Sequence, residues 1–207
     1  MTTKPPRTSG STGYSRRAFL KGSGAAAAAS AIAAGPGALA AEAPAASKVV
    51  AGTTKITLNI NGQDEQVEVE PRMTLLEVLR SRLGLTGAKP VSVDASSGAS
   101  TVLIDGKPVS ANTTLVLETV GKKIVTAESL STGKTDPLAA AFVNRDALQC
   151  GFCTPGFVMA CRAFLNDHPK ATAEQIRANL NGNLCRCGTY ANILMAVEDV
   201  VQGGKNG

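Results

Sequence analysis

The sequence predicts an α+β protein in which a strand-rich half with one helix precedes a half made of four helices. Two observations carry this prediction. In the first half, apolar residues alternate with polar ones and turn signals separate the runs, which is typical of half-buried strands. After Gly133 the strand pattern stops, and the remaining segments have the apolar spacing and the starting residues of helices.

The first half begins with a β-hairpin and a helix. From Lys55, the run "KITLNINGQDEQVEVE" alternates on both sides of an Asn61-Gly62 turn signal, which predicts two paired strands. The next segment, "TLLEVLRSRLG", has apolar residues along one helical face. Its Thr74 is an N-cap residue, and Glu77 three positions later completes a capping box.

Two more extended segments complete this half. "TVLIDGKPVS" predicts a strand with a turn at Asp105-Gly106. "KKIVTAESLS", which begins at Lys122, predicts a last short strand.

Four helices are predicted in the second half. Asp136-Pro137 begins the first, because proline is favoured at the first helical position. "PGFVMACRAFLND" is the second helix, and "TAEQIRANL" is the third, with Thr172 and Gln175 as its capping box. "YANILMAVEDVV" is the fourth. No internal repeat is found.

Residues 1–40 are predicted to be a removable export signal. Arg16 and Arg17 precede a weakly apolar, alanine-rich run and an A-x-A arrangement before Ala41, which is the layout of a secretory signal. The arginine pair resembles a twin-arginine signal. We therefore expect a mature periplasmic chain, exported folded, with a flexible linker at 41–54.

The net charge of +5 lies wholly in this leader, and the remainder of the chain is neutral. A basic face for nucleic acid is therefore not expected on the folded protein. A membrane anchor is the alternative interpretation of the leader. Its alanine run is interrupted by Ser30, Gly35 and Pro36, short of the ~20 apolar residues that a span needs. We expect no membrane span in the mature chain.

All five cysteines lie in the helical half. Cys150 and Cys153 form C-G-F-C, and after 31 residues Cys185 and Cys187 form C-R-C. Each pair lies at or just before a predicted helix start, where backbone N–H groups favour a thiolate. The fifth, Cys161, falls inside the second helix and is expected to be a buried, inert thiol.

The spacing leaves three interpretations open. A [2Fe–2S] cluster takes four thiolates. A structural zinc ion also takes four, although its usual C-x₂₋₄-C spacing does not match the C-x-C pair. A disulfide is possible for C-x-x-C in an exported protein, but it leaves the second pair unexplained. A bridge within C-x-C itself would be strained.

The motifs "QCGFCTPGFVMA" and "NGNLCRCGTY" resemble the small iron–sulfur subunit of the molybdenum hydroxylases, the family of xanthine dehydrogenase, aldehyde oxidoreductase and isoquinoline 1-oxidoreductase. The segments "TLLEVLRSRLGLTGAK" and "TVLIDGKPVSA" resemble the family's β-grasp ferredoxin-like domain. The resemblance implies such a domain at 55–132, a four-helix [2Fe–2S]-binding domain at 133–202 and a tail at 203–207.

The resemblance also implies site residues. Cys150, Cys153, Cys185 and Cys187 match the ligands of the cluster in the helical domain. Gln149 matches a glutamine near the pterin of the large subunit; from the residues alone it reads as a solvated residue at a helix end.

A second cluster of the family belongs in the first half, with C-x₄-C-x₂-C…C spacing. Here Ser92, Ser97 and Ser100 stand at that spacing, Asn112 falls at the fourth position, and residues 1–149 contain no cysteine. A serine hydroxyl is a hard, weakly acidic group and a poor substitute for thiolate. We therefore predict one [2Fe–2S] cluster, with the first half kept for packing or docking.

The resemblance implies an electron-transfer subunit of an aldehyde or N-heterocycle oxidoreductase. Its expected partners are a large molybdenum–pterin subunit and a flavin or cytochrome subunit, and it contributes no substrate catalysis itself. Two alternatives remain: a structural or assembly subunit, and a Cys₄ zinc scaffold without redox role. The only histidine, His168, is expected to be a solvated loop residue.

Overall fold

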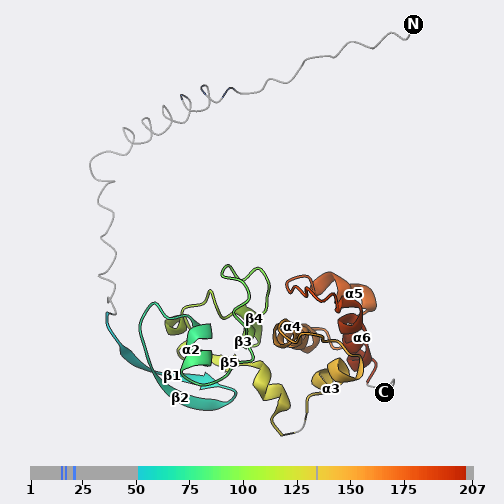
Figure 1. Ribbon diagram of the computed structural model, residues 1–207, viewed down its shortest axis with the longest axis horizontal. Helices are drawn as coiled ribbons and strands as arrows, with labels where there is room; N and C mark the ends of the chain where they lie inside the picture. Colours follow the sequence, from blue (N-terminus) through green and yellow to red (C-terminus); the bar gives the residue numbers. More distant parts are fainter. Residues whose placement is uncertain (1–14, 16, 18–20, 22–50, 134, 204–207) are drawn as a thin grey trace. The chain divides into compact units, whose positions relative to one another are not determined.

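The computed structural model describes residues 51–133 and 135–203, together with Ser15, Arg17 and Lys21. Apart from these three residues, the predicted export signal lies outside the described residues, as do Arg16 of its arginine pair and most of the predicted linker. Residues from Val50 onward form one compact unit, in which a sheet is followed along the chain by helices (Figure 1). In the part of the chain described, no helix is both long enough and apolar enough to cross a membrane.

The predicted hairpin is confirmed as strands β1 (Thr54–Ile60) and β2 (Gln63–Val69), which pair antiparallel with Ile60 opposite Gln63. Asn61 and Gly62 both have positive φ, 54° and 83°, as the tightest two-residue hairpin turn requires. Leu58 and Ile60 of β1 and Val67 and Val69 of β2 are buried, and Ile56 is half-buried.

Helix α2 (Leu75–Ser81) covers the sheet and begins at the predicted capping box: the Thr74 hydroxyl accepts from the Glu77 N–H, and the Glu77 carboxylate accepts from the Thr74 N–H. The helix ends before Leu83, earlier than its apolar pattern predicts. Its buried side chains join those of the sheet in one apolar core, whose largest fully buried members are Leu58, Val69, Leu75, Val78, Leu79 and Ile124.

Strands β3 (Thr101–Ile104) and β4 (Lys107–Ser110) form a second hairpin, again with positive φ at both Asp105 and Gly106. The sheet order is β2-β1-β5-β3-β4. Strand β5 (Lys123–Val125) lies in the middle, parallel to β1 and antiparallel to β3. A short 3₁₀ helix, η1 (Val116–Thr119), precedes β5.

The prediction of a strand through "KKIVTAESLS" was correct only for its start, because a 3₁₀ helix, η2 (Ala127–Ser131), follows β5. Side chains divert the backbone there. Asn61 Oδ1 accepts from the Thr126 N–H at 2.8 Å, and the Ser129 hydroxyl donates to the Thr126 carbonyl at 2.8 Å. Hydrogen bonds from side chains to the backbone compete with strand pairing.

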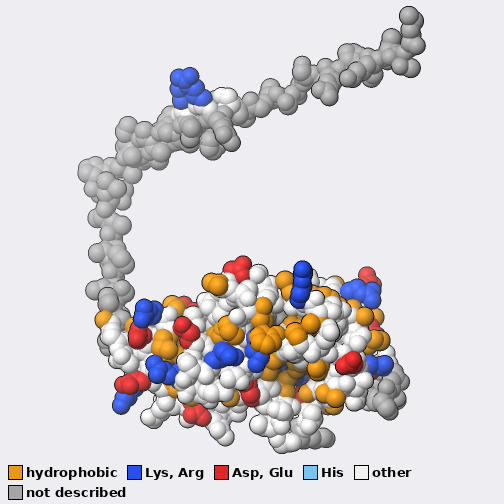
Figure 2. All heavy atoms as spheres, in the orientation of Figure 1, with side chains coloured by type: hydrophobic (Ala, Val, Ile, Leu, Met, Phe, Trp, Pro, Cys, Tyr) orange, Lys and Arg blue, Asp and Glu red, His pale blue; other side chains and the backbone are white. Residues whose placement is uncertain are grey.

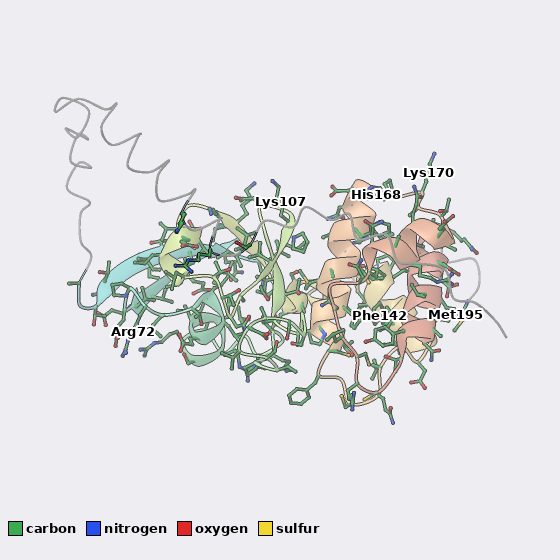
Figure 3. All side chains as sticks on the ribbon, turned by 90° about the horizontal axis from the view of Figure 1, so that it is seen from above. Arg72, Lys107, Phe142, His168, Lys170 and Met195 are labelled. Carbon is green, nitrogen blue, oxygen red and sulfur yellow. The ribbon has the colours of Figure 1, made fainter. Side chains whose placement is uncertain are left out.

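The helical half contains α3 (Pro137–Asn144), α4 (Thr154–Asp167), α5 (Ala173–Asn179) and α6 (Tyr190–Val201). Asp136 caps α3, and the predicted Thr172–Gln175 capping box begins α5. Phe142 lies inside this half (Figure 3), in a core shared by all four helices. These helices agree with the predicted α+β class.

Two ion pairs hold the helices at their ends. Arg145, just after α3, makes two hydrogen bonds of 2.5 and 2.6 Å to the carboxylate of Asp199 on α6. Arg162 on α4 donates to Asp136 at 2.8 Å.

Helix α4 joins the two halves. Its Met159 and Ala163 pack with Leu103 of β3 in a small buried cluster. Gly156, in the first turn, lies so close to the backbone of Gly98 that a Cβ atom there would collide with the Gly98 carbonyl oxygen. The first turn of α4 therefore packs directly against the loop that precedes β3.

Candidate metal centre

The four paired cysteines lie on two loops. Cys150 is in the loop between α3 and α4, and Cys153 is the N-cap residue of α4. Cys185 and Cys187 lie in the loop between α5 and α6. One residue of each pair is buried, Cys153 and Cys185, and the other is exposed.

The environment of Cys185 favours a thiolate. Burial alone would raise its pKa, but hydrogen bonds from the Thr189 hydroxyl, the Thr189 and Gly188 N–H groups and the Cys153 thiol lower the pKa to about 7. The Thr189 Oγ lies 3.2 Å from the sulfur. These donors precede α6, where we expected backbone groups to face a ligand sulfur.

The other thiols are arranged around Cys185. Burial, followed by the hydrogen bond to Cys185, raises the pKa of Cys153 to about 12. The Cys150 N–H lowers the pKa of Cys187, but the Cys150 thiol, burial and the charges of Cys150 and Cys185 together raise it. The two buried cysteines, Cys153 and Cys185, therefore interact with each other across the loops. The two exposed cysteines, Cys150 and Cys187, do the same.

This donor set fits a [2Fe–2S] cluster, in which each of the two irons takes two thiolates. The two cross-loop contacts, Cys153 with Cys185 and Cys150 with Cys187, supply two such pairs. A cavity of about 360 Å³ adjoins them, lined in part by Val91, Phe152, Leu184 and Tyr190. These apolar side chains are themselves partly exposed, so this side of the site is apolar and open to the surface.

Three other residues were singled out from the sequence. Gln149 is exposed immediately before Cys150. Cys161 lies fully buried in α4, away from the paired cysteines, and burial raises the pKa of its thiol to about 12. His168 is exposed at the end of α4 (Figure 3), stacked on Phe164 with ring centroids 4.9 Å apart.

The four replaced positions of the first half also come together. We call residues 92–100 the serine loop. The hydroxyl groups of Ser92 and Ser97 lie 2.8 Å apart, and the Ser97 N–H donates to Ser92 Oγ at 3.0 Å. The Ser100 hydroxyl donates to Asn112 Oδ1 at 2.8 Å, and Asn112 Nδ2 donates to the Ser92 carbonyl at 2.6 Å.

These residues do not fit a second cluster. Their oxygen and nitrogen atoms are hydrogen-bonded to one another, and the set contains no thiol. Hard, neutral donors of this kind do not suit iron–sulfur ligation. Ala95, within the loop, keeps a left-handed backbone with φ of 65°, a conformation that glycine adopts more readily.

Thr189 and Tyr190 were not identified from the sequence as residues that support the cysteines. The Tyr190 hydroxyl accepts from the Cys185 N–H at 2.7 Å, and the Tyr190 ring packs edge-on against Phe157. The signal was present in "CRCGTY", since Thr189 and Tyr190 closely follow the second cysteine pair. Charges of both signs are interspersed over the face shown in Figure 2.

Two neighbouring thiol pairs on loops that begin helices define a class of iron–sulfur protein, and comparison with known proteins gives the same class. Residues 126–198 match the model of the [2Fe–2S] binding domain family. The iron–sulfur-binding subunit of aldehyde oxidoreductase from Escherichia coli (strain K12) is 41% identical in an alignment of 160 residues that covers 70% of this chain and 70% of that one.

The nicotine 6-hydroxylase small subunit of Paenarthrobacter nicotinovorans is 42% identical over 155 residues, covering 74% of this chain and 94% of that one. Among solved structures, quinoline 2-oxidoreductase from Pseudomonas putida 86 matches with a TM-score of 0.70 and 39% identity, over 75% of this chain and 98% of that chain. The chain belongs to the family of small iron–sulfur subunits of the molybdenum hydroxylases.

Proposed function

We propose that this chain is the one-cluster electron-transfer subunit of an exported molybdenum hydroxylase that oxidises aldehydes or N-heterocycles. In this proposal Cys150, Cys153, Cys185 and Cys187 hold the cluster. The single observation that carries it is that the two cysteine loops interact through two thiol pairs, buried Cys153 with buried Cys185 and exposed Cys150 with exposed Cys187.

A bound [2Fe–2S] cluster supplies one-electron chemistry, accepting and releasing a single electron. The chain's own residues provide the conditions for it. Cys153 and Cys185 anchor the buried side, while Thr189 and the backbone around Gly188 direct donors at sulfur. Such hydrogen bonds stabilise negative charge and raise the reduction potential of a thiolate-bound centre.

The exposed side of the site is the proposed docking face for the large molybdenum–pterin subunit. Cys150 and Cys187 are exposed there, and Phe152 and Leu184 each leave more than half of their surface uncovered. Gln149, also exposed beside Cys150, is proposed to lie near the partner's pterin. Exposed apolar side chains around a redox site are expected at a protein interface.

The two halves are proposed to be a β-grasp ferredoxin-like domain followed by a four-helix [2Fe–2S]-binding domain. The serine loop cannot pass electrons onward, so they would leave directly from the remaining cluster to a flavin or cytochrome subunit. The arginine pair at 16–17 and the small-residue run before Ala41 support export of the folded chain to the periplasm.

The test is to produce the chain with its chromosomal neighbours, isolate the complex from periplasm, and measure iron, sulfide and zinc per small subunit. We expect about two irons with matching sulfide. Anaerobic addition of an aldehyde or an N-heterocycle should then bleach the visible absorption of the cluster.

Each other result contradicts the proposal in a defined way. About four irons per chain would mean that the serine loop does hold a cluster. Zinc in place of iron would identify a structural scaffold. If dithionite bleaches the cluster but no aldehyde or N-heterocycle does, the chain does not take part in the oxidation of these substrates.

A further inference from the structure

The serine loop contacts the second cysteine loop directly. The Leu184 N–H donates to the Ser97 carbonyl at 2.9 Å. The side-chain amide of Asn183 donates to the Gly98 carbonyl at 2.8 Å, and Asn183 is only 6% exposed. Both donors immediately precede Cys185, so the position of this cysteine depends on where the serine loop places two carbonyl groups.

The contact at Gly98 is as close as two backbones allow. A Cβ atom on Gly98 would lie 2.5 Å from Asn183 Nδ2 and 2.6 Å from the Gly182 carbonyl oxygen, and φ is +66°. On the other side, Gly156 of α4 packs against the Gly98 carbonyl. The serine loop therefore contacts both the first turn of α4 and the loop that carries Cys185, and Ser97 and Ala99 line the same cavity as Cys150, Cys153 and Cys185.

The conformation of the serine loop is held by its own side chains. Ser92 Oγ bonds both the hydroxyl and the N–H of Ser97, and Asn112 binds the Ser92 carbonyl from outside the loop. These bonds fix Ser97, whose carbonyl receives the Leu184 N–H. Ser96 lies in the same loop but is exposed, and its hydroxyl bonds only Asp94.

We propose that Ser92 and Ser97 are positioning residues for the cysteine site: they hold the serine loop in the shape that fixes Leu184, and through it Cys185. The residues that replace cluster ligands in the first half thus set the geometry around the remaining sulfurs. Outer contacts of this kind orient metal ligands and tune the metal. As far as a cluster is concerned, the inference rests on the proposed function.

The test compares three variants of the full chain, Ser92→Ala, Ser97→Ala and the matched control Ser96→Ala. Two readouts are used. The first is hydrogen exchange of the Leu184 amide, which does not require a cluster. The second is the electron paramagnetic resonance spectrum and the reduction potential of the dithionite-reduced [2Fe–2S] centre.

We expect Ser92→Ala, which loses two hydrogen bonds, to speed exchange at Leu184 by roughly threefold to tenfold. The g-values and the potential should shift while about two irons stay bound. Ser97→Ala should change both readouts in the same direction by less. Ser96→Ala should match the unaltered chain in both.

If Ser92→Ala and Ser97→Ala leave Leu184 exchange, g-values and potential as in Ser96→Ala, the serine loop does not position the site. Should Ser92→Ala fail to fold, Ser97→Ala decides, because besides its contact with Ser92 the Ser97 hydroxyl accepts only one long hydrogen bond, of 3.4 Å from the Ala99 N–H. A chain without any [2Fe–2S] spectrum would overturn the proposed function, while Leu184 exchange would still decide the positioning role.

Discussion

The thiol of Cys153 and the sulfur of Cys185 share a hydrogen bond although 31 residues separate them in the chain. Burial and this hydrogen bond raise the pKa of Cys153 to about 12, whereas hydrogen bonds from Thr189, then Cys153 and Gly188, overcome burial and lower the pKa of Cys185 to about 7. At neutral pH the pair therefore consists of one protonated thiol and one group poised to ionise. Four predictions follow from the site and its surroundings.

Cys185→Ser should abolish cluster binding, because a serine hydroxyl at this position cannot supply a thiolate. Iron should fall from about two per chain to near zero, measured with sulfide and visible absorption. The matched control is Cys161→Ala, which removes the one cysteine that is buried away from the pairs and should keep its iron. Retention of iron by Cys185→Ser would contradict the assignment of Cys185 as a ligand.

Zinc binding by the metal-free chain should strengthen with pH, even above pH 9. Thiols must lose their protons to bind metal. Ordinary thiols, with a pKa of about 8.5, are mostly ionised by then. Cys153, with its pKa raised to about 12, still holds a proton and must release it on binding.

The measurement is a competition titration against a chromogenic chelator at several pH values. Affinity should rise by about tenfold per pH unit for each proton released. In Cys153→Ala the rise above pH 9 should become shallower and end at lower pH, because only Cys187 then keeps a raised pKa among the paired cysteines. A flat profile above pH 9 in the unaltered chain would show that Cys153 is already ionised.

Asn183→Ala should destabilise the chain by roughly 1–3 kcal/mol, because it removes a buried donor and leaves the Gly98 carbonyl without its partner. Urea unfolding measures the free energy. Asn181→Ala is the matched control: its amide bonds Ala178 at the surface, and its loss should have little effect. Equal unfolding midpoints for the two variants would show that the Asn183 contact does not contribute to stability.

The Arg145–Asp199 ion pair should make stability fall in acid. Arg145 lowers the pKa of Asp199, first through its hydrogen bonds. A carboxyl group whose pKa is lowered by folding stabilises the protein above its unfolded pKa of about 3.9, and this contribution is lost as pH falls through the folded value.

Thermal unfolding from pH 6 to pH 3 measures this contribution. Asp199→Asn should melt a few degrees lower than the unaltered chain at pH 6, and the difference should shrink towards pH 3. Arg72→Ala, which removes an exposed ion pair with Glu70, should change little at either pH. A constant difference between Asp199→Asn and the unaltered chain would mean that Asp199 does not titrate against Arg145.

Local signals were sufficient to predict most of the elements. The Asn61-Gly62 turn and the Thr74–Glu77 capping box involve residues a few positions apart, so their geometry is decided within the segment itself. The η2 helix was not predicted, because Asn61, 65 residues away from Thr126 in the chain, helps to bend the backbone there. Such a contact exists only once the sheet has formed.

The candidate site divides in the same way. The two cysteine motifs and the four replaced positions could be found from spacing, and the structure brings each set together. The support from Tyr190 is local and was overlooked. The hydrogen bond between Ser97 and Leu184 could not have been predicted, because it joins backbone atoms of distant segments and leaves no residue pattern.

The serine loop has a consequence for biosynthesis. In this part of the fold the polypeptide itself supplies the groups that hold the loop together, through hydrogen bonds among Ser92, Ser97, Ser100 and Asn112. The sheet half then needs no inorganic component to reach its final shape. The cell's iron–sulfur assembly machinery therefore has to insert only one cluster into this chain, in the helical half.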